Sequence, residues 1–207
     1  MARYTGPKLR LERREGTKLG LKGKRGLSDK HPFKRGKNYP PGVHGPKGRR
    51  RMTDYAVHLR EKQKTKRMYG VMERQFRRYF EIASKSKGQT GLELLRLLET
   101  RLDNVIFRLG FGATRAQARQ FVTHGHVLVN GERVDIPSYK VKPGDEIQLV
   151  TKLAQNPVIA ENIELQPFSV NWITRKNNFS GVVDAIPERT DIDSGINEAY
   201  IVEFYSR

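Results

Sequence analysis

Residues 114–131 read TRAQARQFVTHGHVLVNG, and local signals for a helix, a strand and a turn follow one another in this stretch. Thr114 and Gln117 have the spacing of a capping box, so a helix should begin at Thr114. Gly125 stands where a left-handed residue would end that helix. The apolar positions of the helix fall on one stripe, which should face a core: Ala118, Phe121, Val122 and Gly125.

The remaining positions of this helix form two polar flanks, and neither carries negative charge. One flank holds basic and hydroxyl side chains and the other holds amides and an imidazole: Arg115, Arg119 and Thr123, against Gln117, Gln120 and His124. Both flanks offer hydrogen-bond donors, so the helix predicts an apolar inner face with a basic, amide-rich rim.

The residues after this helix predict a β-hairpin. His126–Val129 alternates like a strand, and Asn130-Gly131 is the strongest short-range hairpin signal, so the chain should return through residues 132–134. Together with RLDNVIFRLG before it and SYKVKPGDEI after it, this unit closely resembles the S-four RNA-binding module. Similar modules are appended to tRNA synthetases, pseudouridine synthases and ribosome-rescue factors, so the module alone does not identify a function.

Charge is distributed very unevenly along the chain of 207 residues, whose formal net charge is +18. Residues 1–51 contain 17 Lys and Arg but three Asp and Glu, whereas residues 151–207 contain five Lys and Arg and eight Asp and Glu. Such a one-sided basic segment repels itself unless a polyanion is near. Nucleic acid is therefore the expected partner, in preference to an anionic membrane surface.

Composition also limits the chemistry. The chain has no cysteine, which excludes disulfides and thiolate zinc sites, and we expect neither a metal nor a cofactor. Its apolar runs are too short to span a bilayer, and the first twenty residues contain no run resembling a secretory signal. We therefore expect a cytoplasmic protein.

Residues 1–51 alternate basic residues with Gly and Pro and have almost no apolar periodicity. Two interpretations fit this composition: a disordered basic tail, or an irregular segment that wraps around RNA. We favour wrapping, because Phe33, Tyr39 and the rigid Pro40-Pro41 pair are unusual in a tail that serves only to carry charge.

Helical periodicity begins at Thr53, which can cap a first helix whose outer face is basic. A second helix should follow Gly70, with an aromatic stripe that faces a core and arginines opposite it. A third should run from Thr90 to Gly110, starting with another capping box at Thr90 and Glu93.

The last quarter of the chain predicts a short helix from Asn156 to Ile163, followed by short strands. The stretches that read as strands are VNWI at 170–173, GVVDAI at 181–186 and AYIVEFY at 199–205. Trp172 is expected to be packed in a core and not to stack on a base.

Several stretches outside the module extend the resemblance to almost the whole chain. They are YPPGVHG at 39–45, LREKQK at 59–64, YGVMERQFRRYF at 69–80, PERTDI at 187–192 and EFYSR at 203–207. With them the sequence resembles the family of bacterial small-subunit ribosomal protein four, the founding family of the S-four module. Some members hold a cysteine-bound zinc near the N-terminus, and the absence of cysteine makes this chain resemble the zinc-lacking form.

The resemblance implies a structural role in the small ribosomal subunit. Such proteins bind early to small-subunit ribosomal RNA, nucleate assembly of its 5′ domain and influence translational accuracy. They also contact the neighbouring small-subunit ribosomal protein five and mRNA where it enters the subunit. Some members repress their own operon, and whether this chain does so is left open.

Two other classes of protein share features with this sequence. An RNA-modifying enzyme is suggested by Arg101-Leu102-Asp103, which reproduces the catalytic triplet of pseudouridine synthases. That triplet lies here inside an amphipathic helix, and the sequence that follows the module is too short for the synthase fold. A transient ribosome-associated factor would be little more than the module and a tail, whereas this chain has a further helical region and C-terminal strands. We therefore expect a protein that is not an enzyme.

The expected fold is α+β with two lobes, one mainly helical and one an S-four-type module with a small antiparallel sheet, preceded by a basic irregular extension. The expected boundaries are residues 1–51 for the extension, 52–98 for the helical lobe, 99–150 for the module and 151–207 for a C-terminal helix and short strands. We expect the C-terminal segment to complete the helical lobe.

The residues expected to bind RNA are basic, amide or imidazole side chains of the extension, the first two helices and the module. They are Arg49, Arg50, Arg51, Lys62, Lys64, Lys66, Arg67, Arg74, Arg77, Arg78, Arg115, Gln117, Arg119, Gln120, His124, His126, Lys140 and Lys142. Which flank of the helix at 114 faces RNA is not decided by the sequence.

Overall fold

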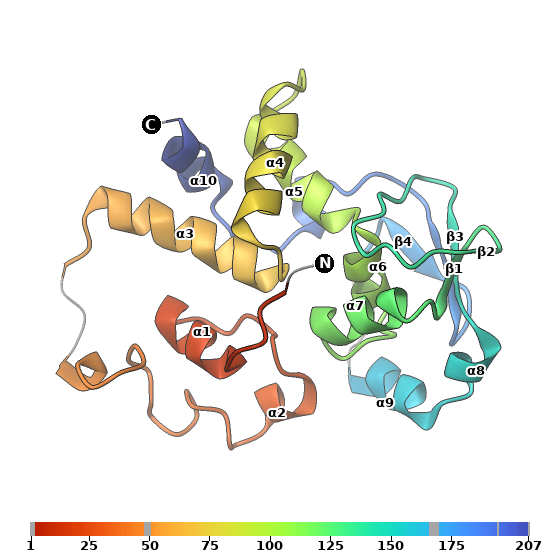
Figure 1. The fold of residues 1–207 in the computed structure, drawn as a ribbon, viewed down its shortest axis with the longest axis horizontal. Coiled ribbons are helices and arrows are strands. Elements are labelled where there is room, and N and C mark those ends of the chain that lie inside the picture. Colours follow the sequence, from red (N-terminus) through yellow and green to blue (C-terminus); the bar gives the residue numbers. More distant parts are fainter. Residues whose placement is uncertain (1–2, 48–50, 166–169, 194, 207) are drawn as a thin grey trace. The chain divides into compact units, whose positions relative to one another are not determined.

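The computed structural model describes residues 3–47, 51–165, 170–193 and 195–206. Within these residues, ten α-helices accompany one antiparallel sheet of five strands, which confirms the α+β class (Figure 1). The chain divides into two compact units, residues 1–93 with 194–207 and residues 94–193. Each unit is described separately below.

The first unit is helical. Its elements are α1 (Lys8–Glu15), α2 (Gly23–Leu27), the 3-10 turn η1 (Gly45–Lys47), α3 (Asp54–Met68), α4 (Glu73–Ser84) and α10 (Glu198–Tyr205). The Thr53 hydroxyl accepts a hydrogen bond from the Ala56 amide at 3.3 Å, which confirms the expected cap of α3. The predicted aromatic stripe of α4 is also confirmed, because Phe76 and Tyr79 are buried.

The N-terminal segment is more ordered than expected, because it contains α1 and α2 and a buried polar pair. The Nε2 atom of His31 lies 2.8 Å from Oε2 of Glu12, and both side chains are almost fully buried. The other Glu12 oxygen accepts hydrogen bonds from the amides of Leu19 and Leu21 at 3.3 and 3.1 Å. Polar contacts between residues far apart in the sequence organise this segment, and a search for apolar periodicity cannot detect them.

The strand expected at residues 199–205 is wrong, because these residues lie in helix α10. The Asn197 side chain caps this helix by accepting a hydrogen bond from the Ala199 amide at 3.1 Å. α10 packs against α3, and its Tyr205 ring stacks on Phe80 of α4 with centroids 4.5 Å apart. Alternating aromatic and aliphatic residues favoured a strand, but the cap and the tertiary ring contacts determine a helix.

The second unit combines helices with the sheet. Its helices and strands are α6 (Leu102–Arg108), α7 (Arg115–Thr123), β1 (Val127–Val129), β2 (Glu132–Arg133), β3 (Glu146–Leu149), α8 (Thr151–Ala154), α9 (Pro157–Leu165), β4 (Ile173–Arg175), β5 (Ser180–Val183) and η2 (Arg189–Asp191), with α5 (Thr90–Glu99) leading into it. The strand order is β2-β1-β3-β5-β4, and every pairing is antiparallel. The strands β4 and β5 therefore extend the sheet begun by the predicted hairpin.

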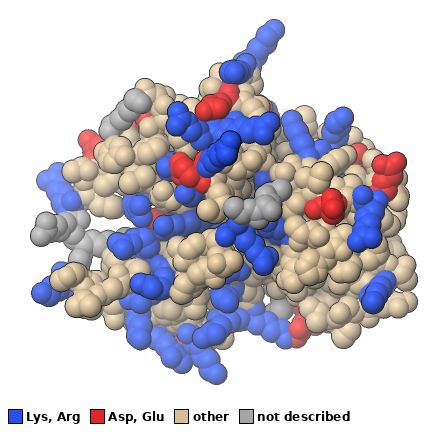
Figure 2. Space-filling view, viewed as in Figure 1, with Lys and Arg blue, Asp and Glu red and all other residues tan. Residues whose placement is uncertain are grey.

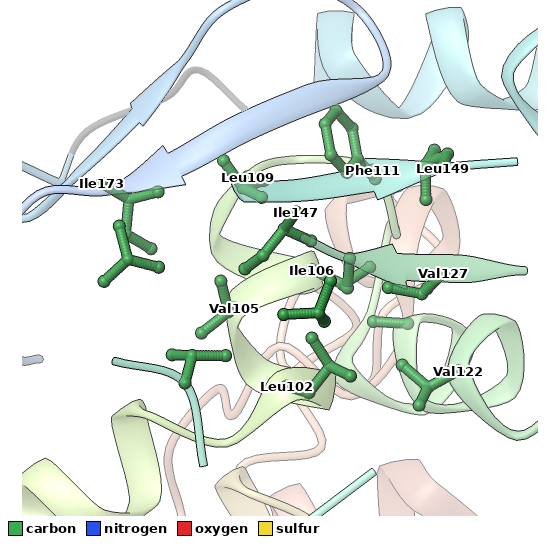
Figure 3. Packing of buried hydrophobic residues seen from close by; sticks show 14 of the residues in the cluster. Leu102, Val105, Ile106, Leu109, Phe111, Val122, Val127, Ile147, Leu149 and Ile173 are labelled. Carbon is green, nitrogen blue, oxygen red and sulfur yellow. The ribbon is translucent and has the colours of Figure 1, made fainter. Parts of the chain in front are cut away.

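The core of this unit lies between α6, α7 and the sheet. Leu102 and Ile106 of α6 point toward β1 and β3, and Val122 of α7 lies beside them (Figure 3). Trp172 is 1% exposed and belongs to the same cluster, so the prediction that it is packed is confirmed.

The expected helix from Thr90 to Gly110 is broken into α5 and α6, with Arg101 extended between them at φ −71° and ψ 136°. The Leu102 amide donates to the Tyr139 carbonyl at 2.9 Å and the Asp103 amide to the Pro137 carbonyl at 3.2 Å. These amides therefore bond to a distant segment and not to the preceding helical turn. The leucine spacing continues through the break, which is why periodicity predicts a single helix.

The boundaries of α7 and the turn of the hairpin are confirmed. The Thr114 hydroxyl accepts a hydrogen bond from the Gln117 amide at 3.2 Å, and Gly125 has a φ of 67°. Asn130 and Gly131 have φ values of 51° and 84°, as a tight turn between two antiparallel strands requires.

Candidate nucleic-acid interface

A single buried carboxylate of α6 binds two arginines, one just before α6 and one on α7. Asp103 accepts hydrogen bonds from Arg101 at 3.0 and 2.6 Å and from Arg119 at 3.3 Å. The side chains of Asp103 and Arg101 are 5% and 3% exposed, and that of Arg119 is 11% exposed. Asp103 therefore neutralises buried guanidinium groups and fixes where Arg119 lies on α7.

A second buried carboxylate, Glu99, organises the neighbouring side chains. It accepts hydrogen bonds from Arg108 at 3.0 and 2.5 Å and from the Asn104 amide nitrogen at 2.6 Å. The Asn104 carbonyl oxygen accepts in turn from Arg115 at 2.7 Å, and the Arg115 guanidinium lies 4.5 Å from the centre of the Phe107 ring. Arg108 and Arg115 are thus held in defined orientations before any ligand arrives.

The expectation that Arg115 and Arg119 form a freely exposed flank is wrong, because both are half-buried and bonded to residues of α6. Gln117 is also engaged, since its side-chain oxygen accepts from the Ala113 amide at 2.8 Å. The other expected residues of this unit remain accessible: His126 is half-buried, and Gln120, His124, Lys140 and Lys142 are exposed.

Arg133 is an exposed basic residue that was not among the residues expected to bind RNA. Its guanidinium donates to the His124 carbonyl at 3.2 Å and covers Gly125 at the end of α7. The hairpin register, which pairs Arg133 with Leu128, brings it there. The Asn-Gly turn predicts that register, so this residue could have been found from the sequence.

Most basic residues of α3 do not form the exposed RNA-binding face that was expected. Lys62 is 5% exposed, and its ammonium lies 2.7 Å from Glu73, which Lys66 also approaches at 2.8 Å. Lys64 pairs with Glu61 at 2.8 Å, and Arg67 pairs with Glu15. These cations hold the first unit together.

The arginines of α4 are arranged differently. Arg74, Arg77 and Arg78 are all exposed, and Arg77 pairs with Glu81, which is also exposed, at 3.3 Å. Arg74 and Arg78 form no ion pair with any described residue and share one face of the helix, four positions apart. Forked guanidinium groups in this position suit phosphate oxygens.

The remaining expected residues lie at the end of the N-terminal segment. Arg49 and Arg50 lie outside the described residues, and Arg51 is exposed. On the face drawn in Figure 2, Lys and Arg gather where Figure 1 places α1 and α2, with few acidic side chains among them. In the described part of the chain, no cluster of His, Cys, Asp or Glu could hold a metal ion.

Comparison with known proteins covers both units. Residues 3–99 match the family description "Ribosomal protein S4/S9 N-terminal domain", and residues 100–147 match "S4 domain". The chain is 54% identical to "Small ribosomal subunit protein uS4" of Dictyoglomus turgidum over 208 residues, and 52% identical to the protein of the same name from Thermus thermophilus over 210 residues. Both alignments cover all of this chain and all of the relative.

The chain belongs to the S4 family of ribosomal proteins. As an S4-family protein it is a structural RNA-binding component of the ribosome and not an enzyme. Asp103, the aspartate of the triplet that resembles pseudouridine synthases, is held in ion pairs with Arg101 and Arg119. No helix in the described ranges of this S4-family protein is long and apolar enough to cross a membrane.

Proposed function

We propose that this protein is a primary binder of small-subunit ribosomal RNA in the cytoplasm and nucleates assembly of the 5′ domain. One observation carries the proposal: each unit exposes its own basic residues, Arg74 and Arg78 on α4 in the first unit and Arg133, Lys140 and Lys142 on the hairpin and the loop after it in the second. Two basic faces can each neutralise phosphates of a different RNA helix, and those helices would otherwise repel one another.

Recognition is expected to rely on shape and phosphate contacts. The deep, narrow groove of double-stranded RNA hides its base edges from side chains, and its shallow groove displays 2′-hydroxyls. Arginine, amide and imidazole groups on α7 and beside the hairpin, such as Gln120, His124 and Arg133, suit those hydroxyls and the adjoining phosphates.

Salt dependence tests the RNA-binding part of this proposal. Full-length protein is titrated onto a 5′-domain fragment of small-subunit ribosomal RNA at several salt concentrations. Release of many counterions should give a log–log slope on the order of several units. A slope near zero would contradict binding dominated by phosphates.

Subunit assembly tests the nucleating role. In reconstitution without this protein, chemical probing should show the 5′ domain folding late or incompletely, and adding the protein first should restore its folding. A protein that stays with small subunits through a high-salt gradient is a constituent. A protein that leaves them is a transient factor instead.

The family resemblance extends the proposal to translational accuracy, to contact with small-subunit ribosomal protein five and to contact with mRNA where it enters the subunit. The C-terminal segment supports a protein partner, because its acidic residues outnumber its basic ones. Crosslinking in purified small subunits should join this protein to protein five. Variants at that contact should raise the error frequency in a misreading reporter.

A further inference from the structure

A cavity of about 740 Å³ opens in the first unit, between the end of α1, the segment at residues 40–45 and α3. Several contacts hold the segment at residues 40–45 in place. Arg13 donates to the carbonyls of Tyr39 and Pro40 at 3.1 and 3.3 Å, and its guanidinium lies 4.8 Å from the centre of the Tyr39 ring. The backbone of Gly45 packs so closely on the Pro40 carbonyl that no Cβ would fit. The segment at residues 40–45 therefore has a defined conformation where it lines the cavity.

Positive charge predominates in the cavity lining. Arg14, Arg60 and Arg67 line it together with one carboxylate, Glu15, whose side chain is 1% exposed. Glu15 pairs with Arg60 at 3.3 Å and also with Arg67, so two guanidinium groups are held in fixed positions. Arg14 is exposed and forms no ion pair with any described residue.

The crowding of these cations affects Arg67 directly. Burial lowers the pKa of the Arg67 guanidinium, Glu15 acts in the opposite direction, and the charges of Arg60 and Arg14 lower the pKa further. An anion in the cavity would relieve this repulsion.

The mouth of the cavity is apolar. Val43 is 89% exposed and Met52 is 46% exposed, and Pro40 and Pro41 also line the cavity. A flat, uncharged ring could cover these side chains while a linked anion reached the arginines. A nucleotide has both parts, whereas an acidic peptide side chain has no flat ring to cover the apolar mouth.

We propose that this cavity receives one unpaired nucleotide of the RNA, with its phosphate at Arg14 and Arg60 and its base against Val43 and Met52. The inference rests on the proposed function, because it names how one part of the protein would contact ribosomal RNA. A paired base cannot enter a cavity, so the nucleotide must be a bulged or looped one.

The absence of cysteine from the chain makes a site-specific crosslinking test possible. Val43→Cys gives the protein a single thiol at the mouth of the cavity, to which a short photo-crosslinker is attached. The control is Leu27→Cys, which places the same group on a residue that is 62% exposed and does not line the cavity. On the 5′-domain RNA fragment, Val43→Cys should crosslink to one unpaired nucleotide that Leu27→Cys does not reach.

A pair of arginine variants tests the phosphate contact. Arg14→Ala and Arg10→Ala each remove one exposed arginine from α1, but only Arg14 lines the cavity. Arg14→Ala should weaken RNA binding by about tenfold and remove the chemical protection of the crosslinked nucleotide. Arg10→Ala should change the affinity by less than about threefold and leave the protection intact. Both melting temperatures should equal that of the parent protein.

The inference would be overturned if Arg14→Ala and Arg10→Ala lost the same RNA affinity, or if the crosslinks were spread over paired strands. If the parent protein still binds the fragment with steep salt dependence in that case, the proposed function survives and only the nucleotide site fails. If the parent protein does not bind the fragment at all, both proposals fail.

Discussion

Helices α3 and α4 are neighbours in the sequence and similarly rich in Lys and Arg, yet their cations have different roles. Lys62 and Lys66 of α3 are held on Glu73, whereas Arg74 and Arg78 of α4 are exposed without an ion pair among the described residues. The carboxylates near a basic residue, more than the number of basic residues, therefore decide which cations stabilise the protein and which remain available to RNA. In α7 the two roles are combined, because Arg119 is held by Asp103 while 11% of its side chain stays exposed.

The largest effect is expected where a carboxylate holds buried cations. Asp103→Ala removes the partner of Arg101 and Arg119 and leaves two partly or fully buried guanidinium groups without it. We expect a loss of about 3–5 kcal/mol in the free energy of unfolding, measured by denaturant titration. Asp135→Ala, at an exposed aspartate of the same unit, should stay within about 0.5 kcal/mol of the parent. Similar losses in the two variants would show that Asp103 does not anchor the arginines.

A smaller effect is expected at Glu73, whose side chain is 46% exposed. Burial tends to raise the pKa of this carboxyl, but hydrogen bonds from Lys62, Lys66 and Tyr205 outweigh it and lower the pKa to about 2. Because this value lies below that of an unfolded glutamate, Glu73 stabilises the fold above about pH 4.5 and loses that contribution as the pH falls toward 2.

Glu73→Gln should therefore lower the stability at pH 7 by about 1–3 kcal/mol, a range reduced for solvent screening. It should also flatten the decrease in stability between pH 4.5 and 2, measured by thermal melts across that range. Glu81→Gln is the matched control, because Glu81 lies on the same helix and, among the described residues, forms an ion pair with the exposed Arg77 alone. If the stability of Glu73→Gln falls between pH 4.5 and 2 as steeply as that of the parent, α3 is not held through this carboxylate.

Substitution of the arginines of α7 should reduce both the stability of the protein and its affinity for RNA. Arg115→Ala with Arg119→Ala removes the hydrogen bond to Asn104 and the ion pair to Asp103, so we expect a loss of about 1–3 kcal/mol in stability. The same variant should weaken RNA binding under conditions where circular dichroism shows it to be folded. A stable variant with weakened binding would instead restore the sequence-based view of a freely exposed flank.

Local signals predicted α7 and its hairpin correctly, because the cap at Thr114, the left-handed Gly125 and the Asn-Gly turn each act within a few residues. The failures depend on partners far along the chain. The pairing of Glu12 with His31 spans 19 positions, and the helix at 198–205 depends on ring contacts with α4. Such contacts leave no periodic trace in the sequence.

The residues of the candidate interface could be predicted only in part, for the same reason. Residue type and helical spacing selected Arg74 and Arg78 of α4, which are exposed, as readily as Lys62 of α3, which is buried. Lys62 lies 4.4 Å from the centre of the Phe204 ring and is paired with Glu73, so its burial depends on the fold of the C-terminal helix. Because residues 199–205 were expected to form a strand, the burial of Lys62 could not be predicted, and Lys62 was wrongly assigned to the binding surface.

The smallest effect on stability, together with a clear effect on RNA binding, is expected for the exposed arginines of α4. Arg74→Ala with Arg78→Ala removes two exposed guanidinium groups and, since alanine favours helices, should change the free energy of unfolding by less than about 0.5 kcal/mol. Loss of two phosphate contacts should reduce the salt slope of RNA binding by about two and weaken binding at moderate salt. Lys85→Ala with Lys87→Ala removes the same charge from exposed positions just beyond α4 and should have a smaller effect, because arginine can bind two phosphate oxygens at once. If the lysine pair weakens binding as much as the arginine pair, α4 contributes only general positive charge, and the contrast with α3 concerns stability alone.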